Sequence, residues 1–232
     1  CGVQHLMFWK LNSDRLEYYS AQLSADSEDV KVAFLNCLQA NEVLLTGGDD
    51  GKIYIWREEK LLKRVSGHEK CVLSMDANED LGLVTTGGLD GHIAVWKLTV
   101  KQSTFGYYAQ LDCLREYSLQ DPEVDSVCYS VQSLCMGSVV ENSFSILIGT
   151  QSGDIYELNY EEDSDNDTLA KVLKSIDAEV LCSISCDATS SFIYTLSKSG
   201  VFTVWDIESL AQVYCRDFAK KATKVIAFQS KH

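Results

Sequence analysis

The chain has 232 residues, of which 46% are hydrophobic and 23% are charged, a composition typical of a folded globular protein with a sizeable core. Its net charge of −14 disfavours nucleic acid and anionic membranes as partners, because both require clustered lysine and arginine. No apolar run is long enough for a transmembrane helix, and the first residues lack the pattern of a secretory signal. The nine cysteines include no C-x-x-C pair and the four histidines are scattered, so we expect reduced core thiols, no metal site and no cofactor.

Taken in order, the chain reads as short apolar stretches bounded by glycine or aspartate, which predict strands, and no stretch keeps the 3.6-residue period of a helix. Residues 2–11 and part of 12–29 predict the last strands of an incomplete unit. Four groups of four strands follow, at residues 31–35, 43–46, 52–56 and 60–65; 71–76, 83–86, 92–98 and 113–119; 133–136, 145–148, 154–159 and 170–174; and 180–186, 192–196, 201–206 and 211–217.

Residues 223–228 predict the start of one more unit. Because the chain begins at Cys1 inside one unit and ends inside another, we expect it to be a piece of a longer protein. Unfinished units would leave exposed strand edges, so we expect the isolated segment to be unstable or to aggregate.

One motif recurs in all four groups: a glycine turn followed by a strand that ends in tryptophan. The turn glycines lie at positions 51, 91, 153 and 200, and tryptophan, or Leu158 in its place, follows five positions later. The four tryptophans of the chain all fall in this position: Trp9, Trp56, Trp96 and Trp205. Units of about 40–45 residues with four strands and a closing tryptophan are typical of WD40 repeats. The sequence therefore predicts an all-β fold: a WD40-type β-propeller segment of about four full four-stranded blades, with partial blades at both ends.

The second full unit carries four polar groups that WD40 blades hold in a buried hydrogen-bonded chain: His68, Thr86, Asp90 and Trp96. The resemblance implies bonds from aspartate to histidine, from histidine to the hydroxyl and from the hydroxyl to the indole N–H. The first unit has Thr46, Asp50 and Trp56 but no histidine, and the fourth has Thr195 and Trp205 with Ser199 in place of aspartate. The third unit has lost its tryptophan, so we expect the blade with Leu158 to open before the blade with His68.

A histidine, a carboxylate and a hydroxyl in one unit also resemble a hydrolase triad, but their spacing is that of a blade. No nucleophile elbow, phosphate-binding glycine loop or metal cluster is present, so we predict no catalytic, cofactor-binding or metal-binding residues and no enzyme activity. An insertion at residues 99–111 contains Phe105, Tyr107 and Tyr108. Aromatic residues on a loop are enriched at interfaces, so this insertion either packs over the propeller rim or contacts a partner.

Several stretches, in order along nearly the whole chain, resemble the echinoderm microtubule-associated protein-like family. Residues 2–9 are similar to its G-[IV]-[KR]-H-[IL]-x-F-W run, and residues 146–158 are similar to its atypical blade hairpin. Further matching stretches are residues 32–34, 51–56, 62–68 and 124–128.

This resemblance implies a tandem pair of propellers, with residues 1–175 as the final blades of the first and residues 180–232 as the opening blades of the second. Alternatively, residues 1–232 form one open propeller segment. The resemblance also implies a non-catalytic scaffold that associates with tubulin or microtubules in the cytoplasm and cytoskeleton. The alternative is a generic WD40 adaptor, for example a ciliary or ubiquitin-ligase substrate receptor, that binds other proteins through its propeller faces.

Overall fold

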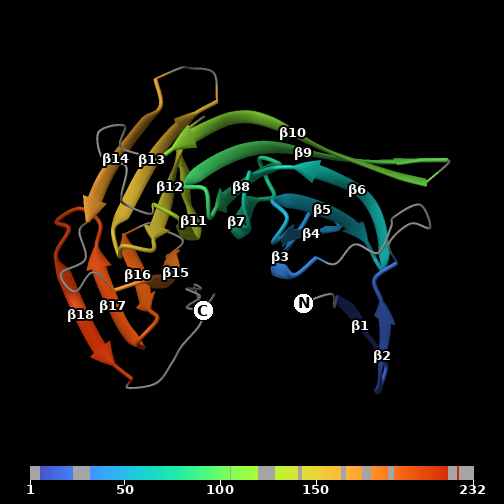
Figure 1. The fold of residues 1–232 in the computed structure, drawn as a ribbon, viewed down its shortest axis with the longest axis horizontal. Helices are drawn as coiled ribbons and strands as arrows, with labels where there is room; N and C mark the ends of the chain where they lie inside the picture. The colour runs from blue at the N-terminus through green and yellow to red at the C-terminus, as the bar shows by residue number, and fades with distance from the viewer. Residues whose placement is uncertain are drawn as a thin grey trace. The chain divides into compact units, whose positions relative to one another are not determined.

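The structure is a computed structural model that describes residues 6–22, 32–104, 106–119, 129–140, 143–162, 166–173, 179–187, 191–218 and 224. These residues form four four-stranded antiparallel sheets and one two-stranded sheet, and the strands of each sheet pair in chain order (Figure 1). This confirms the predicted all-β fold of WD40-type blades. The strand predicted at residues 223–228, the joint predicted near residue 175, and the matching stretch 124–128 lie outside the described residues, apart from Lys224.

The strands have the following bounds. The two-stranded sheet pairs β1 (Met7–Asn12) with β2 (Arg15–Ser20). The first blade contains β3 (Phe34–Ala40), β4 (Val43–Gly48), β5 (Lys52–Arg57) and β6 (Lys60–Ser66). The second contains β7 (Val72–Asn78), β8 (Leu83–Gly88), β9 (His92–Ser103) and β10 (Gly106–Ser118). The third contains β11 (Val131–Val140), β12 (Ser143–Thr150), β13 (Ile155–Glu161) and β14 (Thr168–Leu173). The fourth contains β15 (Leu181–Cys186), β16 (Phe192–Ser197), β17 (Val201–Asp206) and β18 (Gln212–Asp217).

The chain divides into two compact units, Cys1–Ser118 and Leu119–His232. The first unit holds the two-stranded sheet and the first two blades, and the second unit holds the third and fourth blades. The assignment of residues 1–175 and 180–232 to two successive propellers stays a prediction.

Two predicted elements differ from the structure. The first strand of the first blade runs over Phe34–Ala40 and not over residues 31–35. The insertion at residues 99–111 is not a loop, because β9 and β10 continue through it as a long antiparallel hairpin that pairs Ser103 with Gly106. Alternating polar and apolar residues at 98–111 suit a two-stranded ribbon as well as they suit a loop, so the sequence pattern alone did not separate the two.

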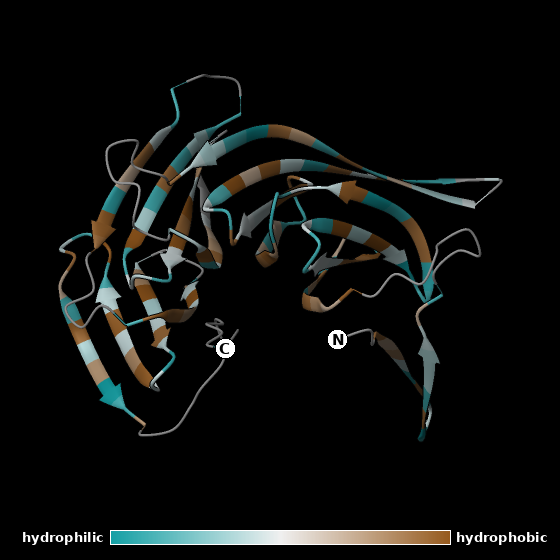
Figure 2. Ribbon diagram, in the orientation of Figure 1, coloured by the Kyte–Doolittle hydropathy of each residue, from teal (hydrophilic) through white to brown (hydrophobic). Residues whose placement is uncertain are grey.

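The core of the first unit lies between its two blades. β3 contacts β7, and one apolar cluster joins Leu45, Ile55 and Val72 with Trp96. Every residue of β8 is buried, whereas every residue of β2 is exposed. This difference follows from position, since an inner strand packs on both faces and an outer strand meets water. Hydrophobic bands recur along the strands of all four blades (Figure 2).

A second cluster connects the two-stranded sheet to the first blade. Leu6 and Phe8 pack with Phe34, Tyr54 and Trp56. Hydrogen bonds between backbones support this contact, because the N–H of Gln22 donates to the carbonyl of Glu59 at 2.6 Å and the N–H of Leu61 donates to the carbonyl of Gln22 at 3.3 Å. Both side-chain contacts and backbone hydrogen bonds therefore attach residues 6–22 to the first blade.

The turn between β4 and β5 requires glycine at position 51. Gly51 has φ +76°, and an added Cβ would collide with the carbonyl oxygen of His68. Gly51→Ala should therefore destabilise the first unit by about 2–3 kcal/mol, measured by urea denaturation. Gly106→Ala is the matched control, because Gly106 also has positive φ (+127°) but nothing lies within 4 Å of an added Cβ. An equal loss in both variants would show that the collision contributes nothing.

Candidate functional site

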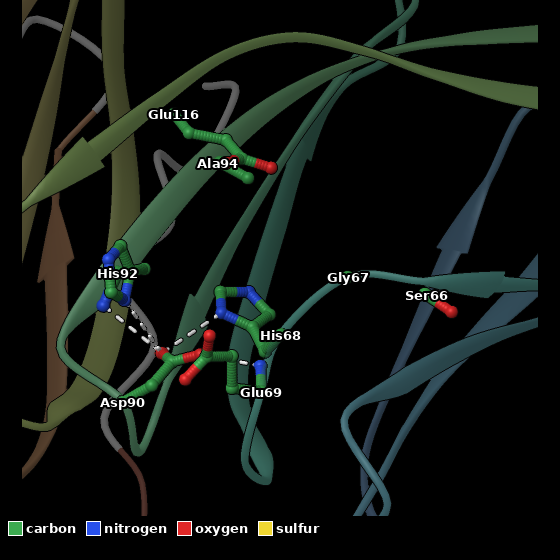
Figure 3. A pocket seen from close by; sticks show the side chains of 8 residues that line it. All are labelled: Ser66, Gly67, His68, Glu69, Asp90, His92, Ala94 and Glu116. Carbon is green, nitrogen blue, oxygen red and sulfur yellow. Dashed lines mark hydrogen bonds and ion pairs between the residues drawn. The ribbon is translucent and has the colours of Figure 1, made fainter.

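The candidate site is an open pocket of about 310 Å³ in the first unit, where β6 leads into β7 and where the turn after β8 leads into β9. Figure 3 shows the side chains that surround it: Ser66, Gly67, His68, Glu69, Asp90, His92, Ala94 and Glu116. Five of these eight residues carry a carboxylate or an imidazole group.

The buried wall of this pocket is a chain of hydrogen bonds. The indole N–H of Trp96 donates to the Thr86 hydroxyl at 2.9 Å. Thr86 Oγ1 lies 2.9 Å from His68 Nε2, and His68 Nδ1 lies 3.2 Å from Asp90 Oδ1. One set of directions suits all three bonds: the hydroxyl donates to Nε2, and Nδ1–H donates to the carboxylate. The structure thus brings Trp96, Thr86, His68 and Asp90 together across β8, β9 and the β6–β7 connection.

Asp90 is the charged end of this chain. Its side chain is only 5% exposed, and it accepts bonds from the backbone N–H of Glu69 at 2.9 Å and of His92 at 3.1 Å. Burial by itself raises the pKa of Asp90, but the bond from His68 and the two backbone bonds outweigh it and lower the pKa to about 2. Asp90 is therefore ionised at neutral pH, and its charge ties three segments of the blade together.

This arrangement is unsuited to nucleophilic catalysis. The His68 side chain is 0% exposed, and both of its ring nitrogens are engaged. The Thr86 hydroxyl is also buried and is shared between histidine and indole. A hydrolase needs its nucleophile within reach of substrate, whereas the Thr86 hydroxyl is fully buried. Among the described residues, no three His, Cys, Asp or Glu side chains are placed to hold a metal ion.

The outer wall of the pocket consists of residues that the sequence did not single out: Glu69, His92 and Glu116. His92 is 38% exposed at its side chain, and its Nδ1 lies 3.7 Å from Asp90 Oδ1 (Figure 3). Two of them could have been found from their closeness in the sequence to the predicted residues, since Glu69 follows His68 and His92 lies two positions after Asp90. Glu116 comes from β10, and pairing with β9 places it opposite Ala94.

Replacing Thr86 by valine should cost the first unit about 2–3 kcal/mol of unfolding free energy. The methyl group fills the same space, but it leaves the buried Trp96 N–H and His68 Nε2 without the hydroxyl. Chemical denaturation followed by tryptophan fluorescence measures the loss. Thr85→Val is the matched control, because Thr85 is equally buried but makes only a 3.4 Å bond to the Asp76 carbonyl. Similar losses for both variants would contradict the role of the hydroxyl bridge.

The first blade keeps part of the chain of bonds with a different partner. The indole of Trp56 donates to the Thr46 hydroxyl at 2.9 Å. Asp50 accepts a 2.9 Å bond from the Tyr54 hydroxyl, where the second blade uses histidine. Burial and this bond to Asp50 both raise the pKa of Tyr54, so the phenol stays protonated and donates. The repeat motif gives no signal for Tyr54, which lies at the motif position of Ala94.

The fourth blade also keeps the indole bond, from Trp205 to the Thr195 hydroxyl at 3.1 Å. Ser199, in the position of the aspartate, lies 2.7 Å from the Ser197 hydroxyl and bonds the Glu179 carboxylate. This shorter side chain reaches the Ser197 hydroxyl beside its own turn and the Glu179 carboxylate, which lies just before β15. The fourth blade therefore closes its turn with neutral hydroxyl groups and a partly exposed carboxylate, not with a buried charge.

The aromatic residues of the long hairpin have separate surroundings. Phe105 lies outside the described residues. Tyr107 is half-buried, with the Arg57 guanidinium 4.1 Å above its ring, so it packs on the end of the first blade. Tyr108 is 51% exposed and its hydroxyl bonds the Gln110 side chain. Tyr107 thus rests on the blade, and Tyr108 faces solvent.

Comparison with known proteins agrees with this geometry. The family described as WD domain, G-beta repeat, matches residues 23–57 and 59–97. Angio-associated migratory cell protein from Homo sapiens is 32% identical over 73 residues, which are 31% of this chain and 17% of that protein. Protein ROOT INITIATION DEFECTIVE 3 from Arabidopsis thaliana is 26% identical over 242 residues, which are 86% of this chain and 55% of that protein.

The chain therefore spans about half the length, or less, of these curated relatives. In the described part of the chain, no helix is long and apolar enough to cross a membrane. The repeat match covers the first blade and the second as far as the middle of β9, and the same four-stranded architecture recurs in the third and fourth. Residues 23–57 and 59–97 therefore carry WD40 repeats, and the described residues have the all-β fold of WD40-type propeller blades.

Proposed function

We propose that this chain is a non-catalytic adaptor that holds other proteins against its blades. The observation that supports this most is the sealed chain of polar groups behind the pocket. Its histidine and hydroxyl are buried and bond each other, so neither is available to react with a molecule in the pocket. WD40 repeats generally serve as protein-binding scaffolds, and this chain contains two stretches that match that repeat. Both relatives align with this chain over part of their length.

The pocket also indicates the chemistry of the partner. Its open side carries the carboxylates of Glu69 and Glu116, and ionised Asp90 lies behind them. The chain as a whole has a charge of −14. Opposite charge favours association and like charge opposes it, so the pocket suits a lysine or arginine side chain of a partner segment. A volume of about 310 Å³ can admit one such side chain but not a folded element.

The test is a fluorescence-anisotropy titration of the protein with labelled peptides of equal length that are rich in lysine and arginine, neutral or acidic. We expect binding of the basic peptides only, weakened at least tenfold by Glu69→Lys with Glu116→Lys. Glu58→Lys with Glu79→Lys is the matched control, since these carboxylates lie on other turns of the same two blades. Binding that ignores the pocket variants, or the absence of any peptide binding, would contradict the proposal.

A second candidate function is association with tubulin or microtubules, with the cytoskeletal location that it entails. Its support is the resemblance of residues 146–158, which form the β12–β13 hairpin, to the echinoderm microtubule-associated protein-like family. The acidic charge opposes it, because the microtubule surface is also acidic. Neither relative's name mentions tubulin. Co-sedimentation with microtubules and co-elution with tubulin dimers test it, and the lack of both would exclude it.

A further inference from the structure

Two cysteine side chains meet between the two blades of the second unit. Cys135 lies on β11, the first strand of the third blade, and Cys186 ends β15, the first strand of the fourth. Their sulfur atoms are 3.1 Å apart although the residues are 51 positions apart in the sequence. β11 contacts β15 directly, so the pair bridges two blades and not two strands of one sheet.

The surroundings of the two sulfur atoms differ. Cys135 is buried in an apolar cluster with Leu147 and Ile184, and Cys186 packs at its edge with partial exposure. The backbone N–H of Cys186 donates to Cys135 Sγ at 3.2 Å, and Cys186 Sγ lies 3.5 Å from the Met136 carbonyl oxygen. Cys135 is thus placed to attack and Cys186 to meet an oxidant.

We propose that Cys135 and Cys186 form a reversible disulfide that fastens the third blade to the fourth under oxidising conditions. The oxidant is a peroxide. It transfers one oxygen atom to the Cys186 thiol, which becomes a sulfenic acid while the peroxide leaves as an alcohol or water. Cys135 sulfur then attacks Cys186 sulfur, the S–O bond breaks, and the hydroxyl group leaves as water with the proton of the Cys135 thiol. A dithiol returns the pair to its reduced state by exchange.

Formation of this disulfide requires little movement of the two cysteines. A disulfide has sulfur atoms about 2.05 Å apart, so the pair must close by roughly 1 Å. Cys186 ends its strand and Cys135 lies just before the register shift of β11 between Met136 and Val139, so each has an irregular neighbour that can adjust. The other cysteine of β15, Cys182, instead donates to the Leu196 carbonyl within its own blade at 3.3 Å.

The experiment exposes the reduced protein to graded hydrogen peroxide, blocks remaining thiols with N-ethylmaleimide and maps the peptides by mass spectrometry. We expect a linked Cys135–Cys186 peptide at the lowest effective dose, lost on treatment with dithiothreitol, and a rise in the Tm of the oxidised protein. Cys186→Ser should abolish the linked peptide and the rise in Tm. Cys182→Ser is the matched control on the same strand and should retain both.

Peptide mapping of the unaltered protein decides the matter even if a serine variant fails to fold. Cys215 is exposed and competes for oxidant in the same unit. Linkage of Cys215 or Cys182 in place of the proposed pair, or stepwise oxidation of Cys186 to sulfinic acid without a link, would overturn the proposal.

Discussion

Replacing Trp56 by alanine is expected to cost the first unit about 4–5 kcal/mol, a large part of the total stability of a typical domain. The Trp56 side chain is 0% exposed and its ring lies 5.8 Å from that of Phe34 and 6.2 Å from that of Tyr54. Truncation leaves a cavity at the contact between the two-stranded sheet and the first blade. It also removes the indole N–H that bonds the buried Thr46 hydroxyl. Both losses act on the same free energy of unfolding.

Trp9→Ala is the matched control for this prediction. Trp9 occupies the same position in the sequence motif, but it is 60% exposed and only rests on Tyr18 with ring centroids 5.3 Å apart. We expect it to cost less than about 1 kcal/mol. Urea denaturation of both variants, followed by circular dichroism at a β-sheet wavelength, gives the comparison. Equal losses would show that the motif position, and not burial, decides the contribution of tryptophan.

The comparison of Trp56 with Trp9 shows what the sequence could predict and what it could not. The glycine turn and its tryptophan identified the repeats, because only glycine tolerates the turn at positions 51, 91, 153 and 200, each with positive φ. Most strand positions followed from the apolar stretches, but β3 ends five residues later than predicted and β10 begins seven residues earlier. The burial of each tryptophan, however, depends on which strands pack against it, and the repeat motif does not indicate which strands these are.

The third blade shows a second limit. Leu158 replaces the tryptophan, and the hydroxyl position of the motif is occupied by Ile148, which is also fully buried. A hydrogen-bonded pair has thus been exchanged for an apolar pair, a change that can leave stability nearly the same because no polar group is left without a partner. The expectation that this blade is weaker rests on Leu158 alone and not on Ile148. That the blade with Leu158 opens before the blade with His68 stays a prediction, which hydrogen exchange of β12 and β8 can test.

The candidate site was predictable to a smaller extent. The four polar groups of the second blade could be named because they sit at fixed places in the repeat. The pocket in front of them could not, since Glu116 reaches it only through the pairing of β10 with β9. The contact of Tyr54 could not be predicted for a related reason. The Tyr54 hydroxyl bonds Asp50 because the Tyr54 side chain lies on the same side of the blade as the turn that carries Asp50. Such contacts depend on register and side-chain direction.

We expect protonation of Asp90 to lower the free energy of unfolding of the first unit at acid pH. The pKa of Asp90 is lowered to about 2 in the folded protein from the usual 3.8. A lowered pKa means that the folded state binds the proton less well than the unfolded state. The resulting stability is fully present above pH 3.8 and is lost as pH falls toward 2. The shift corresponds to about 2 kcal/mol, because one pKa unit is worth about 1.4 kcal/mol.

The measurement is urea denaturation at a series of pH values between 5 and 2, together with an NMR titration of the Asp90 carboxyl carbon. We expect Asp90→Asn to lower stability at neutral pH, since the amide cannot accept all the bonds from His68, Glu69 and His92. We also expect its stability to fall less steeply below pH 4. Asp80→Asn, at an exposed turn of the same blade, should retain the wild-type acid slope. If Asp90→Asn also retains that slope, the charge of Asp90 does not hold the blade, and His68 must be positioned by Thr86 alone.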